Sequence, residues 1–439
     1  MSPFFIKAVQ LLLSLSFLII LHELGHFIPA RLFKTRVEKF FLFFDVKFAL
    51  FRKKVGETEY GIGWLPLGGY VKISGMIDES MDTEQMKEPP QPWEFRSKPA
   101  WQRLIIMLGG VTVNLILGFL IYMMVLFVWG KTTLSNNDLP YGLEPTPLAE
   151  ALGFKNGDEI LAVDGKPLEN ILDVNRYLLL RNVNTVDVIG NDGRSRVVPI
   201  PENFGYQMFQ SGEMFPLYPS SPVLINSVVP DGPAAKAGLM ANDEILGVNE
   251  TAVNNFTNFT KALKTQGKNP FDLIVLREGI LDTFSIRTNS EGKIGVLLQN
   301  SNIAFKTRTL SFSESIIEGF GHTYWTLYDY VSQFQYIFTK KGASQLGGFG
   351  AIGNLFPPVW DWRGFWNSTA LISIILAFMN VLPIPALDGG HVMFLLYEMV
   401  TGRKPNDKFM EYAQMTGFFL LMVLVLYANG NDLMRAFFE

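Results

Sequence analysis

The segment FFIKAVQLLLSLSFLIILHELGHFIPARL, Phe4–Leu32, is an apolar run that contains a small group of ionisable residues. A helix needs about 20 mostly apolar residues to cross a bilayer, so this run is long enough to span. The alternative is a cleaved signal peptide with Lys7 as its basic start. The run does not stop at a small-residue cleavage site, however, but continues into Phe27 and Ile28. We therefore expect a first transmembrane helix within residues 1–34.

The ionisable group within this run has the pattern H-E-x-x-H, written His22-Glu23-Leu24-Gly25-His26. On a helix, two histidines four residues apart lie on one face and can bind one Zn²⁺. Zinc lowers the pKa of a bound water toward ~7, and Glu23 is placed to accept its proton and pass it to the leaving amine. Burying ionisable groups unpaired is costly, so their presence in an apolar helix indicates a functional site. The alternative is a helix end at the membrane surface with solvated side chains.

The composition supports a membrane protein. The chain has 439 residues, of which 48% are hydrophobic and 18% charged, and its mean hydropathy is +0.20. Three further runs carry no charged residue: Leu104–Gly130, Gly364–Leu387 and Ala413–Gly430. They predict membrane segments at 102–130, 364–396 and 413–430, respectively. The net charge of −4 gives no sign of nucleic-acid binding. With no cysteine, the chain has neither disulfides nor thiolate zinc ligands.

Basic residues predict the orientation of these four spans. Residues 31–54 hold eight Lys or Arg and two Asp or Glu, and the link before the last span holds Arg403, Lys404 and Lys408. Loops rich in Lys and Arg stay in the cytoplasm. The region 35–101 is therefore expected on the cytoplasmic side. Both termini and the long segment 131–363 are expected on the outer side, which is the periplasm in a bacterium with two membranes.

An internal repeat organises the outer segment. TPLAEALGFKNGDEILAVDG at Thr146–Gly165 is repeated as GPAAKAGLMANDEILGVNE at Gly232–Glu250. Each copy has an Ala-rich helix, a turn, and an apolar strand after Asp-Glu, which resembles the core pattern of PDZ domains. We expect two PDZ-like α+β modules at 131–202 and 221–300, joined by a Pro-rich and aromatic linker at 203–220. They could bind extended peptides at a sheet edge or only restrict access sterically.

The region 311–345 has helical periodicity but is too polar to span the membrane. It could lie in the outer interface as an amphipathic helix, with its aromatic residues at headgroup depth. Packing against the PDZ-like modules is an equal alternative. His322 falls in this region, and we interpret it as a structural histidine.

A third zinc ligand is expected far from the first two. The segment NVLPIPALDGGH, Asn380–His391, closes an apolar run, and Pro383 and Pro385 interrupt its helix. Irregular backbone at membrane depth is tolerated where it lines a cavity, so Asp388 is the favoured third ligand. His391 is a competing ligand. The structural alternative is that Asp388 only caps a helix starting at Gly389.

Together these motifs resemble the site-2 protease family of intramembrane metalloproteases, in particular its bacterial members with two PDZ domains. The resemblance covers nearly the whole chain, including Lys98–Arg103 and Gly347–Ile352. It implies that His22, His26 and Asp388 bind Zn²⁺ and that Glu23 is the catalytic base. It also implies an active site toward the cytoplasmic side of the bacterial inner membrane.

The resemblance extends to substrate-binding segments. Tyr60–Lys72 (YGIGWLPLGGYVK) resembles the family's membrane-dipping β-hairpin, and alternating apolar residues around Pro-Leu-Gly-Gly favour such a hairpin; a plain cytoplasmic hairpin is the alternative. An exposed strand edge there could hold an unwound substrate by β-addition. The residues expected to contact substrate are Gly61, Gly63, Asn114, Asn380, Pro383 and Pro385. Helix packing is an equal role for the two asparagines. The family's Ala-Gly-Pro-x-x-Asn is Leu108–Asn114 here and lacks the proline, which puts a local kink in doubt.

The predicted function is zinc-dependent cleavage of single-span membrane proteins within the bilayer. By resemblance, the substrates are anti-sigma factors after a first cut and remnant signal peptides, and the PDZ-like pair filters substrates by size. One alternative is a membrane scaffold that captures peptide ligands with its PDZ-like modules and has an inactive metal site. Another is a membrane-anchored peptidase for soluble peptides.

Overall fold

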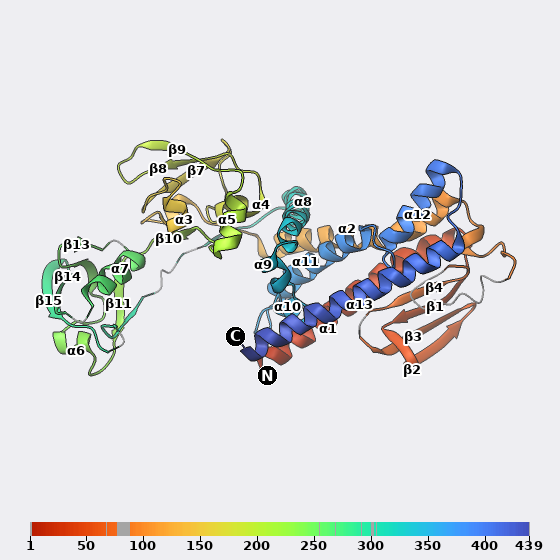
Figure 1. The fold of residues 1–439 in the computed structure, drawn as a ribbon, viewed down its shortest axis with the longest axis horizontal. Coiled ribbons are helices and arrows are strands. Elements are labelled where there is room, and N and C mark those ends of the chain that lie inside the picture. Colours follow the sequence, from red (N-terminus) through yellow and green to blue (C-terminus); the bar gives the residue numbers. More distant parts are fainter. Residues whose placement is uncertain are drawn as a thin grey trace. The chain divides into compact units, whose positions relative to one another are not determined.

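The computed structural model describes residues 2–66, 68–76, 88–253, 255–267, 269–290, 292–299, 303 and 305–438. The chain divides into two compact units (Figure 1). One unit combines residues 1–131 with 309–439, and the other comprises residues 132–308.

Among the described residues of the first unit, four helices are long and apolar enough to span a membrane, which confirms the predicted fold class. They are α1 (Pro3–Leu32), α2 (Ala100–Trp129), α11 (Trp362–Val381) and α13 (Asp407–Phe438). Helix α2 is continuous through the segment where the family's proline is missing. It ends at Trp129 and is followed by Gly130, whose φ of 72° is disfavoured for other residues. The two chain termini lie at the same end of this unit (Figure 1).

The third predicted span is interrupted at its prolines. Helix α11 ends at Val381, and α12 (Asp388–Thr401) begins only after a bend of six residues, 382–387. Pro383 and Pro385 lack a backbone N–H and cannot continue the helical hydrogen-bond pattern. The predicted segment 364–396 is therefore two helices joined by a bend.

Helix α8 (Phe312–Ile337) occupies most of the predicted amphipathic region. Ser311 and Glu314 form a capping box at its start. Rings of α8 contact the membrane helices, with His322 stacked edge-on against Tyr122 of α2 at 4.4 Å between ring centroids. One face of α8 therefore packs on α2 and α11, while Phe320 and other aromatic residues remain exposed.

Two short helices follow, α9 (Lys340–Gln345) and α10 (Phe349–Gly353). The Asp432 carboxylate of α13 accepts hydrogen bonds from the backbone N–H groups of Gly348 and Ala351 at 2.9 and 3.1 Å. These bonds link the C-terminal part of α13 to the segment around α10.

A four-stranded sheet lies between α1 and α2 in the chain. Its strands are β1 (Val37–Leu42), β2 (Phe44–Val55), β3 (Thr58–Leu65) and β4 (Tyr70–Ile73), in the order β2-β3-β1-β4. The prediction that the strands on either side of Pro66–Gly69 pair as a hairpin was wrong. Leu67, within this turn, lies outside the described residues. Strands β3 and β4 both form, but β1 lies between them, parallel to β3 and antiparallel to β4. The hairpin in this sheet is β2–β3, which turns at Gly56 with φ 61°.

The second unit contains two small α/β modules with separate hydrophobic cores, consistent with PDZ-like domains. The first module consists of β6 (Leu143–Pro145), α3 (Pro147–Glu150), β7 (Glu159–Val163), α4 (Asp173–Leu180), β8 (Thr185–Ile189), β9 (Ser195–Pro199), α5 (Phe204–Ser211) and β10 (Leu217–Pro219). The prediction of a linker at 203–220 was wrong, because this stretch forms α5 and β10. Strand β10 pairs with β6, and Phe204, Met208 and Leu217 are buried in the first core, because these apolar side chains complete it.

The second module repeats the local structure of the first. Its elements are β11 (Val223–Val228), α6 (Pro233–Ala237), β12 (Glu244–Val248), β13 (Thr251–Ala252), α7 (Phe256–Gln266), β14 (Phe271–Arg277), β15 (Ile280–Ile286) and β16 (Val296–Leu298). A short pair, β5 (Lys131–Thr133) and β17 (Lys306–Arg308), joins the two ends of the segment. In both modules the aspartate of the repeated Asp-Glu is 1% exposed and paired with an arginine: Asp158 with Arg196, and Asp243 with Arg277.

Candidate metal centre

The two histidines of the H-E-x-x-H motif lie one turn apart on α1. This helix is unbroken from Pro3 to Leu32, so His22 and His26 point to the same side. Their ring centroids are 4.9 Å apart, and their Nε2 atoms are 3.3 Å apart. This spacing allows one ion to reach both rings.

Glycines allow α1 and α2 to cross in backbone contact beside these histidines. A Cβ on Gly25 would lie 2.5 Å from the carbonyl oxygen of Gly109, and a Cβ on Gly109 would lie 1.9 Å from that of Gly25. A Cβ on Gly110 would lie 2.4 Å from Nε2 of His26. A side chain at these positions would separate the helices or displace a histidine ring.

The close crossing fixes the tautomer of His26. Its Nδ1 lies 2.8 Å from the carbonyl oxygen of Ile106 on α2. A carbonyl only accepts hydrogen bonds, so Nδ1 carries the proton and Nε2 presents a lone pair. Metal-binding histidines commonly have such a backbone partner.

Asn114 has the corresponding position beside His22. Its amide group lies 3.1 Å from His22 Nδ1, and the Asn114 side chain is fully buried. With nitrogen facing the ring, Asn114 Oδ1 has no hydrogen-bond partner among the described residues. The hydrogen-bond network favours the opposite amide orientation, in which the Asn114 oxygen faces the ring. Oδ1 then accepts a hydrogen bond from the Nδ1–H of His22, and His22 Nε2 carries a lone pair in place of a proton.

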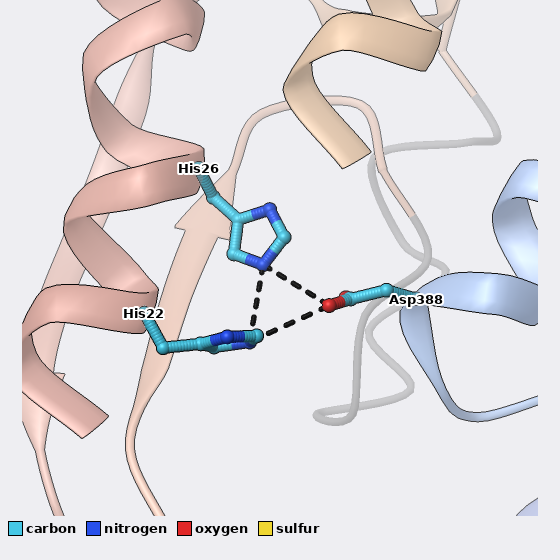
Figure 2. A group of neighbouring side chains, drawn as sticks. All are labelled: His22, His26 and Asp388. Carbon is cyan, nitrogen blue, oxygen red and sulfur yellow. Dashed lines mark hydrogen bonds and ion pairs between the residues drawn. The ribbon is translucent and has the colours of Figure 1, made fainter. Parts of the chain in front are cut away.

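Asp388 approaches the histidines from the other end of the chain (Figure 2). It is the first residue of α12, and the capping position before it is occupied by Leu387, so the structure does not support the interpretation that Asp388 only caps this helix. Its Oδ2 atom lies 3.4 Å from His22 Nε2 and 3.3 Å from His26 Nε2. The three ligand atoms lie within 4.8 Å of one another.

This cluster fits a divalent cation. With both Nδ1 atoms protonated, the two Nε2 lone pairs and a carboxylate oxygen converge on one point. Asp388 Oδ2 is buried without a hydrogen-bond partner among the described residues, and such a group is costly unless a cation satisfies it. Two imidazoles and one carboxylate with room for a further ligand form a donor set typical of catalytic zinc.

Glu23 lines the same small space as the three ligands. The cavity has a volume of about 30 Å³ and is lined by His22, Glu23, His26, Val71, Ile73, Met76, Met107 and Asp388. That volume is enough for a water molecule. The Glu23 side chain is buried, and its carboxylate accepts a hydrogen bond from the backbone of Val71 on β4. The edge strand β4 therefore borders the cavity.

The residues predicted to contact substrate fall into two groups. The Asn380 amide lies 3.4 Å from His22 Nε2, and Pro383 and Pro385 form the bend before Asp388. Gly61 and Gly63 are not among the residues that line the cavity. A Cβ on Gly61 would lie 2.2 Å from the Phe41 ring, and one on Gly63 would lie 2.3 Å from the Phe44 backbone, so packing within the sheet accounts for both glycines.

His391, the competing third ligand, is not part of the described cluster, and its Nε2 atom contacts Gln414 instead. The His391 Nε2 atom lies 2.9 Å from Gln414 Nε2 on α13. No pattern in the sequence indicated that Gln414, Ile106 and Val71 are neighbours of the site. The Ile106 contact is made by the backbone, so its side-chain type gives no signal, whereas Gln414 is one polar residue near the start of an apolar run.

Comparisons with known proteins agree with this geometry. The model for "Peptidase family M50" matches residues 10–424. The regulator of sigma E protease of Haemophilus influenzae is 27% identical to this chain over 457 residues, covering 97% of this chain and 98% of that protein. Metalloprotease MmpA of Caulobacter vibrioides is 27% identical, covering 99% and 97%. Protease RseP of Yersinia pestis is 28% identical, covering 97% of each chain.

Proposed function

Because this chain belongs to peptidase family M50, a family of zinc metalloproteases, we propose that it cleaves single-span membrane proteins within the bilayer, with Glu23 as the general base. The observation that carries the proposal is the convergence of His22, His26 and Asp388 beside Glu23, on helices long enough to span a membrane. A soluble zinc protease would not need its H-E-x-x-H motif to lie in an apolar helix.

The residues of the cluster divide into metal ligands and a proton carrier. His22, His26 and Asp388 would hold Zn²⁺, which when bound supplies Lewis acidity and lowers the pKa of a water molecule. Glu23 lines the same cavity and would accept the proton of the attacking water. It would then donate that proton to the amine released when the peptide bond breaks.

The sheet next to the cavity has an edge strand with which an unwound substrate segment could pair. A transmembrane helix hides its peptide bonds in its own hydrogen bonds, so it must unwind before a carbonyl carbon can be attacked. Strand β4 is an edge of its sheet and borders the cavity through Val71. An unwound substrate segment added to such an edge would lie extended beside Glu23.

The proposed substrate class rests on the resemblance to site-2 proteases and on the similarity to the Haemophilus regulator of sigma E protease. The expected substrates are anti-sigma factors after a first cut and remnant signal peptides. The two PDZ-like modules would exclude proteins that still have a bulky outer domain. Removing residues 135–300 should then allow cleavage of an intact substrate, and unchanged selectivity would exclude the filter.

The proposed orientation places the modules and both termini in the periplasm of a bacterium with an inner and an outer membrane. The chain has no cysteine, so single cysteines can report each side. Lys53→Cys on exposed β2 should be protected from a membrane-impermeant thiol reagent applied outside, whereas Asp192→Cys in the first module should react. Equal labelling of the two variants would contradict the orientation.

The central experiment uses purified full-length protein and a tagged single-span substrate. The wild type should bind zinc and cut this substrate, and Glu23→Gln should bind equal zinc but react about 10²–10⁴-fold more slowly. A Glu23→Gln variant with undiminished cleavage would exclude the proposed base. Faster cleavage of unstructured casein than of the membrane substrate would favour a peptidase for soluble peptides.

A further inference from the structure

One side chain of the last helix contacts the chain on both sides of Asp388. Gln414 lies on α13 and is 7% exposed. Its Oε1 atom accepts a hydrogen bond from the backbone N–H of Ala386, and its Nε2 lies 2.9 Å from His391 Nε2. Ala386 precedes Asp388 by two residues and His391 follows it by three. Gln414 therefore joins the bend to the first turn of α12.

The orientation of this amide is fixed by its partners. A backbone N–H only donates, so the atom facing Ala386 must be the oxygen of Gln414. The NH₂ group then faces His391, whose Nε2 must accept and whose proton must lie on Nδ1. The His391 Nε2 lone pair is thereby committed to Gln414 rather than to the metal cluster.

The bend that Gln414 contacts has a backbone conformation that needs support. Ala386 has φ 75°, in the left-handed region that is unfavourable for a residue with a Cβ. Gly417, one turn after Gln414, packs against the same bend, and a Cβ there would lie 1.9 Å from the carbonyl oxygen of Pro385. Gln414 and Gly417, on one face of α13, therefore both contact the bend that precedes Asp388.

We propose that Gln414 is a positioning residue of the metal centre, which holds the bend at Ala386 so that the Asp388 carboxylate faces His22 and His26. This inference rests on the proposed role of Asp388 as a zinc ligand. Gln414 itself does not line the cavity of the cluster. Its effect should therefore appear in zinc affinity and in the protection of one backbone amide, before any effect on the chemical step.

The test compares two substitutions in full-length protein. Gln414→Leu removes both hydrogen bonds, whereas Gln414→Glu retains an acceptor for the Ala386 N–H. Zinc affinity is measured by competition with a chelator, and hydrogen–deuterium exchange of the Ala386 amide is measured in metal-free protein. Thr416→Val, on an exposed face of the same helix, is the matched control.

Outer partners of a zinc site typically change affinity by about 10–100-fold. We expect that loss for Gln414→Leu, with faster exchange at Ala386, and near wild-type values for Gln414→Glu and Thr416→Val. Wild-type zinc affinity in Gln414→Leu would overturn the inference, as would equal losses in Gln414→Leu and Gln414→Glu. A wild type that bound no zinc would refute the proposed function itself. A wild type that bound zinc, with unchanged affinity in Gln414→Leu, would refute only the role of Gln414.

Discussion

The crossing of α1 and α2 makes a quantitative prediction about Gly109. In Gly109→Ala the new Cβ would lie 1.9 Å from the Gly25 carbonyl oxygen, and Cβ contacts under 3.0 Å essentially never occur. The helices must therefore separate by about 1.1 Å at this point. The hydrogen bond from His26 Nδ1 to Ile106, now 2.8 Å, would lengthen to about 3.9 Å and be lost.

Two losses should follow from this separation. Overpacking at a close contact typically costs about 1–3 kcal/mol of folding free energy. Loss of the partner that orients a metal-binding histidine should weaken zinc binding by about 10–100-fold. The assays are thermal unfolding in detergent and zinc competition with a chelator. The control is Gly321→Ala on α8, where a Cβ would meet nothing within 4 Å. Zinc affinity in Gly109→Ala equal to that of Gly321→Ala would refute the reasoning.

Three further predictions concern individual interactions. Asn114→Leu should weaken zinc binding about 10–100-fold, because His22 Nδ1 loses its hydrogen-bond acceptor. Asn114→Asp keeps an acceptor oxygen and should retain zinc binding. If a chelator competition showed weaker binding for Asn114→Asp than for Asn114→Leu, the orientation with Asn114 Oδ1 facing His22 would be contradicted. Burial would raise the pKa of Asp243, but hydrogen bonds from Arg277 and the Met240 backbone lower it below its ordinary value, so the second module should lose stability as pH falls below about 4. Thermal unfolding against pH should show that loss for the wild type and not for Asp243→Asn, and equal curves would exclude it. Chelation should abolish cleavage and zinc should restore it, whereas cleavage that persists in demonstrably metal-free protein would contradict a zinc mechanism.

Local patterns in the sequence were sufficient to predict several features. The four-residue spacing of His22 and His26 determines their relative position on any helix. The two prolines before Asp388 indicated a broken helix, and the structure has that break. The repeated Asp-Glu segments predicted two modules, and two separate cores are present.

Features that depend on long-range packing were not predictable in the same way. Alternating residues indicated strands on both sides of Pro66–Gly69, but a strand pattern does not identify its partner, and β1 separates β3 from β4. The aromatic stretch 203–220 has loop-like prolines, yet its apolar side chains are needed to complete the first core. Gln414 is a single residue whose partners lie 23 and 28 positions away.

The most direct test of the metal centre is the zinc content and zinc X-ray absorption spectrum of the purified wild type and Asp388→Asn. The wild type should hold one zinc per chain with nitrogen and oxygen ligands at about 2.0–2.2 Å. Asp388→Asn should lose most of this zinc or show one carboxylate ligand fewer. Equal zinc content and identical spectra for the two proteins would contradict a centre shared by α1 and the first residue of α12.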